Sequence, residues 1–86
     1  METVLLHSEI DNLLYIINYI QKVTKSEDLK YSLCEKTNFY YKCFYVQISY
    51  HEHDTLVPLS GFTGDGFKSM ARKIIDTFVK KEGILK

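Results

Sequence analysis

The hydrophobic pattern is clearest in the last third of the chain, where apolar residues recur every three or four positions. The seven apolar positions are Phe67, Met70, Ala71, Ile74, Ile75, Phe78 and Val79. This spacing places them all on one face of an α-helix. Glycines before Phe67 allow a sharp turn into the helix, and Thr63 or Asp65 can cap its first free N–H groups. Gly83, just after the last periodic position, can end the helix.

A second amphipathic segment near the start of the chain predicts a helix from about Glu9 to Thr24. Its apolar residues again follow mostly helical spacing: Ile10, Leu13, Leu14, Ile17, Tyr19, Ile20 and Val23. Ser8 is a suitable N-cap, with Asp11 three residues further on. Because the apolar surface is broad, we expect the helix to be buried more than halfway round. Its more polar side carries Asn12, Asn18, Gln21, Lys22 and Lys25.

Three strands are predicted between the helices. They cover residues 30–35, 39–50 and 55–60, with short polar turns at 36–38 and 51–54. In the second strand, the alternation puts Phe44, Val46, Ile48 and Tyr50 on one face, which we assign to the core because it is mostly aliphatic and β-branched. Its other face carries Tyr41, Cys43 and Tyr45. Pro58 suits an edge position in the third strand.

The order of these segments predicts an α+β domain with the arrangement α-β-β-β-α. Its three-stranded antiparallel sheet would carry both helices on one face. The 86 residues make one domain, 1–86, with a core from about 8 to 82, and an apolar fraction of 45% is enough for a globular core. No apolar run is long enough to span a membrane.

The net charge of zero conceals an asymmetry along the chain. Residues 67–86 contain six cations and two anions and have a net charge of +4, whereas residues 1–66 have a net charge of −4. The cations of the last helix are Lys68, Arg72, Lys73, Lys80 and Lys81. A basic helix on a slightly acidic body can steer a polyanion to one face, but charge alone favours the simpler interpretation of a solvated helix surface.

Several motifs of the chain resemble the double-stranded RNA-binding domain family. Lys30-Tyr31-Ser32-Leu33 is similar to the family's first strand, and Phe44-Tyr45-Val46-Gln47-Ile48 to its second. Gly64-x-Gly66 followed by Lys68-Ser69-x-Ala71-Arg72 resembles its motif of glycines and then Lys-Lys-x-Ala-Lys. Ser69 stands where the family has its second lysine, and the gap after Gly66 is one residue shorter. The turn at 36–38 lacks the family's Gly-Pro-x-His element.

The resemblance implies sequence-independent binding of double-stranded RNA by a small stand-alone domain. Lys68 and Arg72 match basic positions that contact phosphates, and Ala71 matches the alanine that packs on the sheet. Lys73 is a further candidate for phosphate contact. Asn18, Gln21 and Lys22 resemble the polar positions of the first helix that enter a minor groove.

The tyrosines of the outward sheet face support a different hypothesis. Tyr41 and Tyr45 flank Cys43 there, and tyrosine is favoured at interfaces because it combines a large area with a polar tip. The domain would then be a protein-interaction or dimerisation module that binds no RNA. A third hypothesis, a small inhibitor of a larger enzyme, fits the near-neutral charge but has no specific support.

No residue pattern indicates catalysis, a cofactor or a bound metal. His51-x-His53-Asp54 is interpreted as a polar loop, because it is a short run with no fourth ligand nearby in the sequence. Neither cysteine has a histidine in a nucleophile pattern. Two cysteines without a signal peptide predict free thiols in a reducing, cytoplasmic setting. The predicted partners are therefore double-stranded RNA, a protein or a second copy, and not a membrane.

Overall fold

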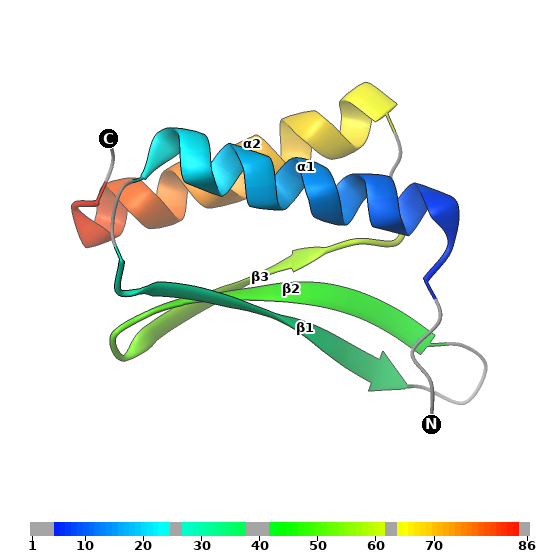
Figure 1. Cartoon of the computed structure of the whole chain (residues 1–86), viewed down its shortest axis with the longest axis horizontal. Coiled ribbons are helices and arrows are strands. Elements are labelled where there is room, and N and C mark those ends of the chain that lie inside the picture. Colours follow the sequence, from blue (N-terminus) through cyan, green and yellow to red (C-terminus); the bar gives the residue numbers. More distant parts are fainter. Residues whose placement is uncertain (1–4, 25–26, 38–41, 62–63, 85–86) are drawn as a thin grey trace.

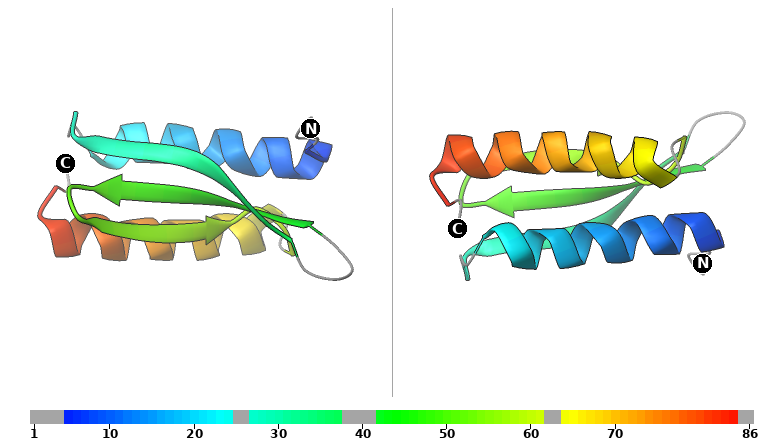
Figure 2. Two further views of the ribbon diagram at one scale, coloured as in Figure 1. Left: turned by 90° about the horizontal axis from the view of Figure 1, so that it is seen from below. Right: turned by 90° about the horizontal axis from the view of Figure 1, so that it is seen from above.

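The computed structural model describes residues 5–24, 27–37, 42–61 and 64–84. Its elements are α1 (His7–Val23), β1 (Leu29–Thr37), β2 (Lys42–Tyr50), β3 (His53–Pro58) and α2 (Gly64–Glu82). The strands form one antiparallel sheet in the order β1-β2-β3. Both helices lie on the same face of the sheet (Figure 1), α1 on the side of β1 and α2 on the side of β3 (Figure 2). The predicted class and order of elements are confirmed.

The core forms where the alternating face of β2 meets the apolar stripes of both helices. Phe44, Val46 and Ile48 are buried, as predicted, because alternate residues of a strand point to the same side of the sheet. The rest of the core comes from the two helices, β3 and the segment after it: Ile16, Ile20, Val57, Leu59, Phe67, Ala71, Ile75, Phe78 and Val79.

Helix α1 begins differently from the prediction. Leu6 is the residue that precedes its first turn, so Ser8 lies inside the helix and the assignment of Ser8 as N-cap is wrong. The backbone N–H of Leu6 donates to Glu9 Oε1 at 2.9 Å, and Ser60 Oγ donates to Glu9 Oε2 at 2.6 Å. A contact with the segment after β3 therefore fixes where this helix starts, which local capping preferences cannot reveal.

Strand ends also differ from the prediction. Lys36 and Thr37 belong to β1, opposite Cys43 and Lys42, and do not form a turn. The turn between β2 and β3 is limited to His51 and Glu52, because Tyr50 pairs directly with His53. His51 adopts a φ of 55°, which a tight two-residue hairpin requires. Residues 38–41, which include the predicted turn residue Asn38 and the start of the predicted second strand, lie outside the described residues.

Helix α2 has the predicted apolar face, with Met70 and Ile74 half-buried beside its five buried residues. Its end is also as predicted. Gly83 follows the helix with a φ of 71°, and the N–H of Ile84 donates to Val79 O at 3.0 Å. These are the features of a glycine-terminated helix. At the other end, Asp65 is the second residue of α2 and not its cap, and Thr63 lies outside the described residues.

Candidate nucleic-acid interface

The two helices meet at a shallow depression on the side of the helix layer that faces away from the sheet. Its volume is about 220 Å³, and it is lined by Tyr15, Asn18, Tyr19, Lys22 and Arg72. Asn18 and Lys22 lie one turn apart on α1, and Arg72 comes from α2. The fold thus brings together two of the residues predicted on the first helix and one predicted on the second.

Lys68 extends this basic surface towards the start of α2. It is exposed and one turn before Arg72, and its Nζ lies 5.6 Å from the centroid of the Tyr15 ring. This distance is typical of a cation–π contact. A neighbouring depression of about 310 Å³ holds Lys68 together with Ser8 and Asp11. We call Lys22, Lys68 and Arg72, with Asn18, the helix-layer basic surface.

Two stacked tyrosines support this surface from beneath. The Tyr15 and Tyr19 rings lie 5.9 Å apart at 22°, and Tyr15 also meets the Phe67 ring edge-on at 6.3 Å. Tyr19 Oη donates to Asp76 Oδ1 at 2.7 Å across the two helices. Burial, this hydrogen bond and the negative charge of Asp76 raise the pKa of Tyr19 to about 12. The hydrogen bond from Tyr19 to Asp76 thus links the two helices directly.

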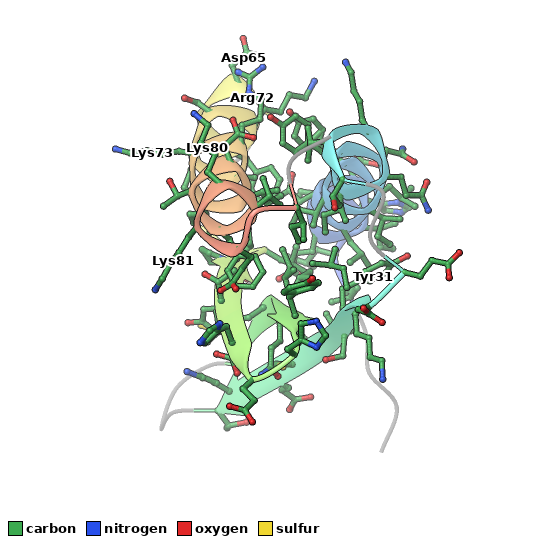
Figure 3. The ribbon with its side chains drawn as sticks, turned by 90° about the vertical axis from the view of Figure 1, so that its left-hand side faces the viewer. Tyr31, Asp65, Arg72, Lys73, Lys80 and Lys81 are labelled. Carbon is green, nitrogen blue, oxygen red and sulfur yellow. The ribbon has the colours of Figure 1, made fainter. Side chains whose placement is uncertain are left out.

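Two of the predicted RNA-binding residues do not join this surface. Gln21 is exposed on α1, but it does not line the depression that holds Asn18 and Lys22. Lys73 points away from α1 (Figure 3) and lies instead beside β3. Neighbouring residues of a helix differ by about 100° in direction, so consecutive cations cannot all face one ligand.

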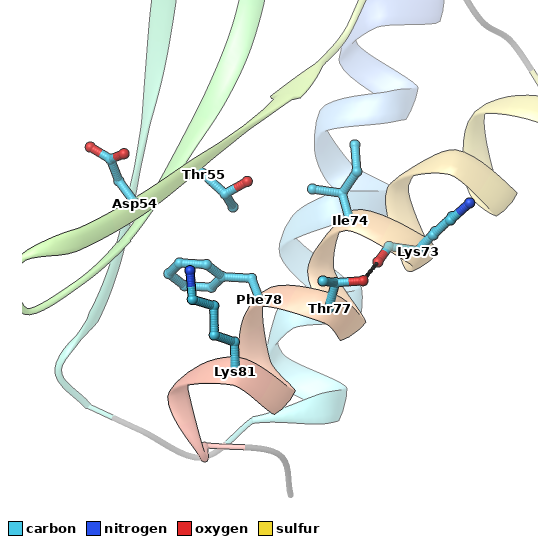
Figure 4. A pocket seen from close by; sticks show the side chains of 7 residues that line it. All are labelled: Asp54, Thr55, Lys73, Ile74, Thr77, Phe78 and Lys81. Carbon is cyan, nitrogen blue, oxygen red and sulfur yellow. Dashed lines mark hydrogen bonds between the residues drawn. The ribbon is translucent and has the colours of Figure 1, made fainter.

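Lys73 lies at a separate groove between α2 and β3 of about 370 Å³ (Figure 4). Its lining is Asp54, Thr55, Lys73, Ile74, Thr77, Phe78 and Lys81. Thr77 Oγ1 is already engaged with the Lys73 carbonyl at 2.7 Å, and Asp54 Oδ2 accepts from Gln47 at 2.9 Å. The groove also contains the Asp54 carboxylate, and its two lysines lie beside β3, away from the helix-layer basic surface. The sequence could not predict this groove, because β3 and α2 come side by side only in the folded chain.

The sheet face opposite the helices carries the predicted interface residues in part. Cys43 and Tyr45 are half-buried there, and Tyr41 lies outside the described residues. Lys36 Nζ lies 5.3 Å from the centre of the Tyr45 ring. Next to this pair, Cys34 Sγ contacts Gln47 Oε1 at 3.4 Å. Polar groups thus cover much of this face, and Tyr45 is not part of an open apolar patch.

His51 and His53 lie in two separate polar contacts. His53 Nδ1 lies 2.9 Å from Glu82 Oε1, which ties the start of β3 to the end of α2, and His51 Nε2 lies 3.8 Å from Asp28. Among the described residues, no group of three or more His, Cys, Asp or Glu side chains is placed to hold a metal ion. Cys34 and Cys43 are free thiols, opposite Tyr45 and Lys36 and not opposite each other.

Comparisons with protein-family models, with curated proteins and with solved structures gave no match. The resemblance to the double-stranded RNA-binding domain therefore stays a prediction from the quoted motifs. Neither helix in the described part of the chain is long and apolar enough to cross a membrane.

Proposed function

We propose that this domain binds double-stranded RNA without sequence preference, through its helix-layer basic surface. The observation that carries the proposal is the convergence of Lys22 and Asn18 of α1 with Arg72 of α2 around one depression. Lys68, over the Tyr15 ring, adds a third cation next to it. The quoted motifs that resemble the family support the same substrate.

Duplex RNA suits such a surface for physical reasons. Its base edges lie in a deep, narrow groove, so proteins contact phosphates and 2′-hydroxyl groups instead. Exposed cations on two neighbouring helices can neutralise phosphates on either side of a groove. The Asn18 amide in the same depression can both donate to and accept from a 2′-hydroxyl.

The charge balance sets the strength of this binding. Three cations provide about two or three phosphate contacts, fewer than the six to ten of strongly salt-dependent binders. Asp11 lies in the depression next to Lys68, and Asp76 lies beside Tyr19, so both carboxylates repel an approaching phosphate. We therefore expect weak binding, which would suit an accessory protein or a shield of duplex RNA in a reducing cytoplasm.

Fluorescence anisotropy with a labelled duplex of about 20 base pairs tests the proposal. Raising salt from about 50 to about 200 mM should weaken binding about 10- to 50-fold, as two or three phosphate contacts require. Lys68→Glu combined with Arg72→Glu should weaken it at least about tenfold at the lower salt, because it reverses two of the three charges.

The matched control is Lys73→Glu combined with Lys81→Glu, which makes the same charge change on the same helix at the groove beside β3. It should change the affinity much less. Equal losses in the two double variants would show that net charge and not this surface governs binding. An unchanged affinity of the Lys68/Arg72 variant would refute the proposal.

A further inference from the structure

The large apolar side chains left in solvent gather on one side of the molecule. The exposed fractions are 68% for Leu6, 39% for Ile10, 53% for Leu14, 42% for Tyr31 and 41% for Leu33. Ile10 and Leu14 belong to α1, Leu6 immediately precedes it, and the other two belong to β1. In a domain of this size, exposed apolar side chains gathered on one side are typical of an interaction site.

Both groups lie on the side away from α2. Leu6, Ile10 and Leu14 recur at every fourth position, so they share one flank of α1. Tyr15 and Tyr19 occupy the opposite flank, where they contact α2. The apolar flank of α1 therefore lies above the β1 side of the sheet (Figure 2).

On β1, the two exposed residues point to the helix side of the sheet. Tyr31 is opposite Ile48 and Leu33 is opposite Val46, and opposite residues of an antiparallel pair lie on the same face. They stay exposed because β1 is the edge strand, and Tyr31 lies at the outer edge on the α1 side (Figure 3). We call this flank of α1 and β1 the outer apolar surface.

The edge of β1 itself is suited to strand pairing. The strand has nine residues and no proline, and in the described chain it pairs only with β2. An exposed edge of this length presents backbone N–H and C=O groups to a further strand. The other edge, β3, has six residues and ends at Pro58, which has no N–H to donate.

We propose that a second copy of this chain occupies the outer apolar surface, by antiparallel pairing of β1 with β1. Along a strand, the backbone N–H and C=O groups of successive residues point alternately to the two sides. Two opposite residues that bond each other must both point towards the partner, so their numbers are both odd or both even. Opposite residues then come from the same face of each sheet. The result is a six-stranded sheet with all four helices on one side and the two α1 flanks facing each other.

Charge complementarity selects one register of this pairing, the one centred on Ser32. It places Tyr31 opposite Leu33 of the second copy, and Asp28, the turn residue just before β1, opposite its Lys36, each of them twice by symmetry. Centring the pair on Leu33 would oppose Lys30 and Lys36 within the strand, and centring it on Tyr31 would bring Glu27, two residues before β1, towards Glu35. Like charges directly opposite each other destabilise a sheet, whereas aromatic–aliphatic and opposite-charge pairs stabilise it.

A stable dimer would bury only a modest share of the surface of this domain. A specific interface covers about 800 Å² on each partner, which is roughly an eighth of the 6084 Å² of accessible surface here. The five exposed apolar side chains and the whole edge of β1 contribute to that area. The proposal concerns a different strand and a different face from the tyrosines predicted as an interface.

Sedimentation velocity and light scattering over a range of protein concentrations test this dimer. The wild-type chain should dimerise, and Leu33→Lys should raise the dimer dissociation constant at least about tenfold, because it places two cations in the apolar centre of the interface. The Lys68→Glu, Arg72→Glu variant should dimerise like the wild type. A wild-type chain that stays monomeric at about 0.5 mM would overturn the proposal.

A charge swap tests the register without touching the core. Asp28→Lys and Lys36→Asp should each raise the dissociation constant about tenfold, because each creates two like-charge pairs. The double variant restores two opposite-charge pairs and should return close to the wild-type value. Both positions are exposed, and circular dichroism checks that each variant folds without the Asp28–His51 or the Lys36–Tyr45 contact. If the losses of dimer affinity from the two substitutions add up in the double variant, the register centred on Ser32 is excluded.

Discussion

At the scale of single residues, two buried polar side chains help to set the position of α1, which the hydrophobic pattern did not predict. Asn12 was placed on the polar side of its helix, yet it is buried, and its Nδ2 donates to the Leu59 carbonyl at 3.0 Å. Glu9 is likewise buried and receives hydrogen bonds from Leu6 and Ser60. The hydrogen bonds of these two side chains hold α1 against the chain segment that follows β3.

Asn12→Ala should lower the free energy of unfolding by about 1–3 kcal/mol, because it leaves the Leu59 carbonyl without this donor in a buried place. Asn18→Ala is the matched control. It makes the same chemical change on the same helix at an exposed position, and should change stability by less than about 0.5 kcal/mol. Urea denaturation measures both, and similar losses in the two variants would contradict the role given to Asn12.

Tyr19 makes a contact whose strength depends on pH. Its pKa is about 12 in the folded chain and 10.0 in a model peptide, so folding favours the protonated phenol. The stabilisation is then complete below pH 10 and is lost as the pH rises through 12. We expect the difference in unfolding free energy between the wild type and Tyr19→Phe to shrink between pH 9 and pH 11.5. A constant difference over that range would contradict the coupling to Asp76, because other titrating groups are common to both proteins.

At the scale of elements, the period of the hydrophobic pattern predicted what each segment becomes, and tertiary contacts set where it ends. Two faces were predictable, the alternate residues of β2 and the stripe of α2, because burial of a face imposes its own period. The start of α1 depends on Ser60, more than fifty residues away along the chain. Similarly, β1 runs on through Lys36 and Thr37 because β2 offers partners to them.

The buried face of α2 includes one small residue, Ala71. Ala71 is 0% exposed in the core cluster, and the resemblance to the RNA-binding family implied that an alanine packs tightly there. Ala71→Leu should lower the free energy of unfolding by about 1–3 kcal/mol, because the core has to move apart to accept the larger side chain. Ser69→Leu, which places the same side chain on the solvent side of α2, should have little effect on a urea unfolding curve. Equal destabilisation in the two variants would indicate that the leucine weakens the helix itself and does not act through core packing.

At the scale of the whole molecule, the candidate site illustrates what one sequence can predict. The resemblance supplied Lys68, Arg72, Asn18, Gln21 and Lys22, and the structure places Asn18, Lys22 and Arg72 around one depression with Lys68 next to it, but not Gln21. Lys73, a further candidate from its charge, could not be separated from them in the sequence, because the direction of each side chain depends on how α2 turns on the sheet. The outer apolar surface was missed for a related reason. Leu14 and Tyr31 look like core residues in the pattern, and only the topology shows that no described element covers them.

The two proposed surfaces together predict a dependence on duplex length. In the dimer all four helices lie on one side of the sheet, so the two helix-layer basic surfaces face the same way. A duplex of about 60 base pairs can reach both, whereas about 20 base pairs suffices for one domain, which covers about 16. Binding to the second site is then intramolecular, and it raises the apparent affinity without any new contact. Leu33→Lys should therefore weaken binding to the long duplex at least about tenfold and leave the short duplex unaffected. Anisotropy titrations with both duplexes measure this, and equal effects on the two lengths would show that Leu33 contributes to RNA binding in some way other than dimerisation.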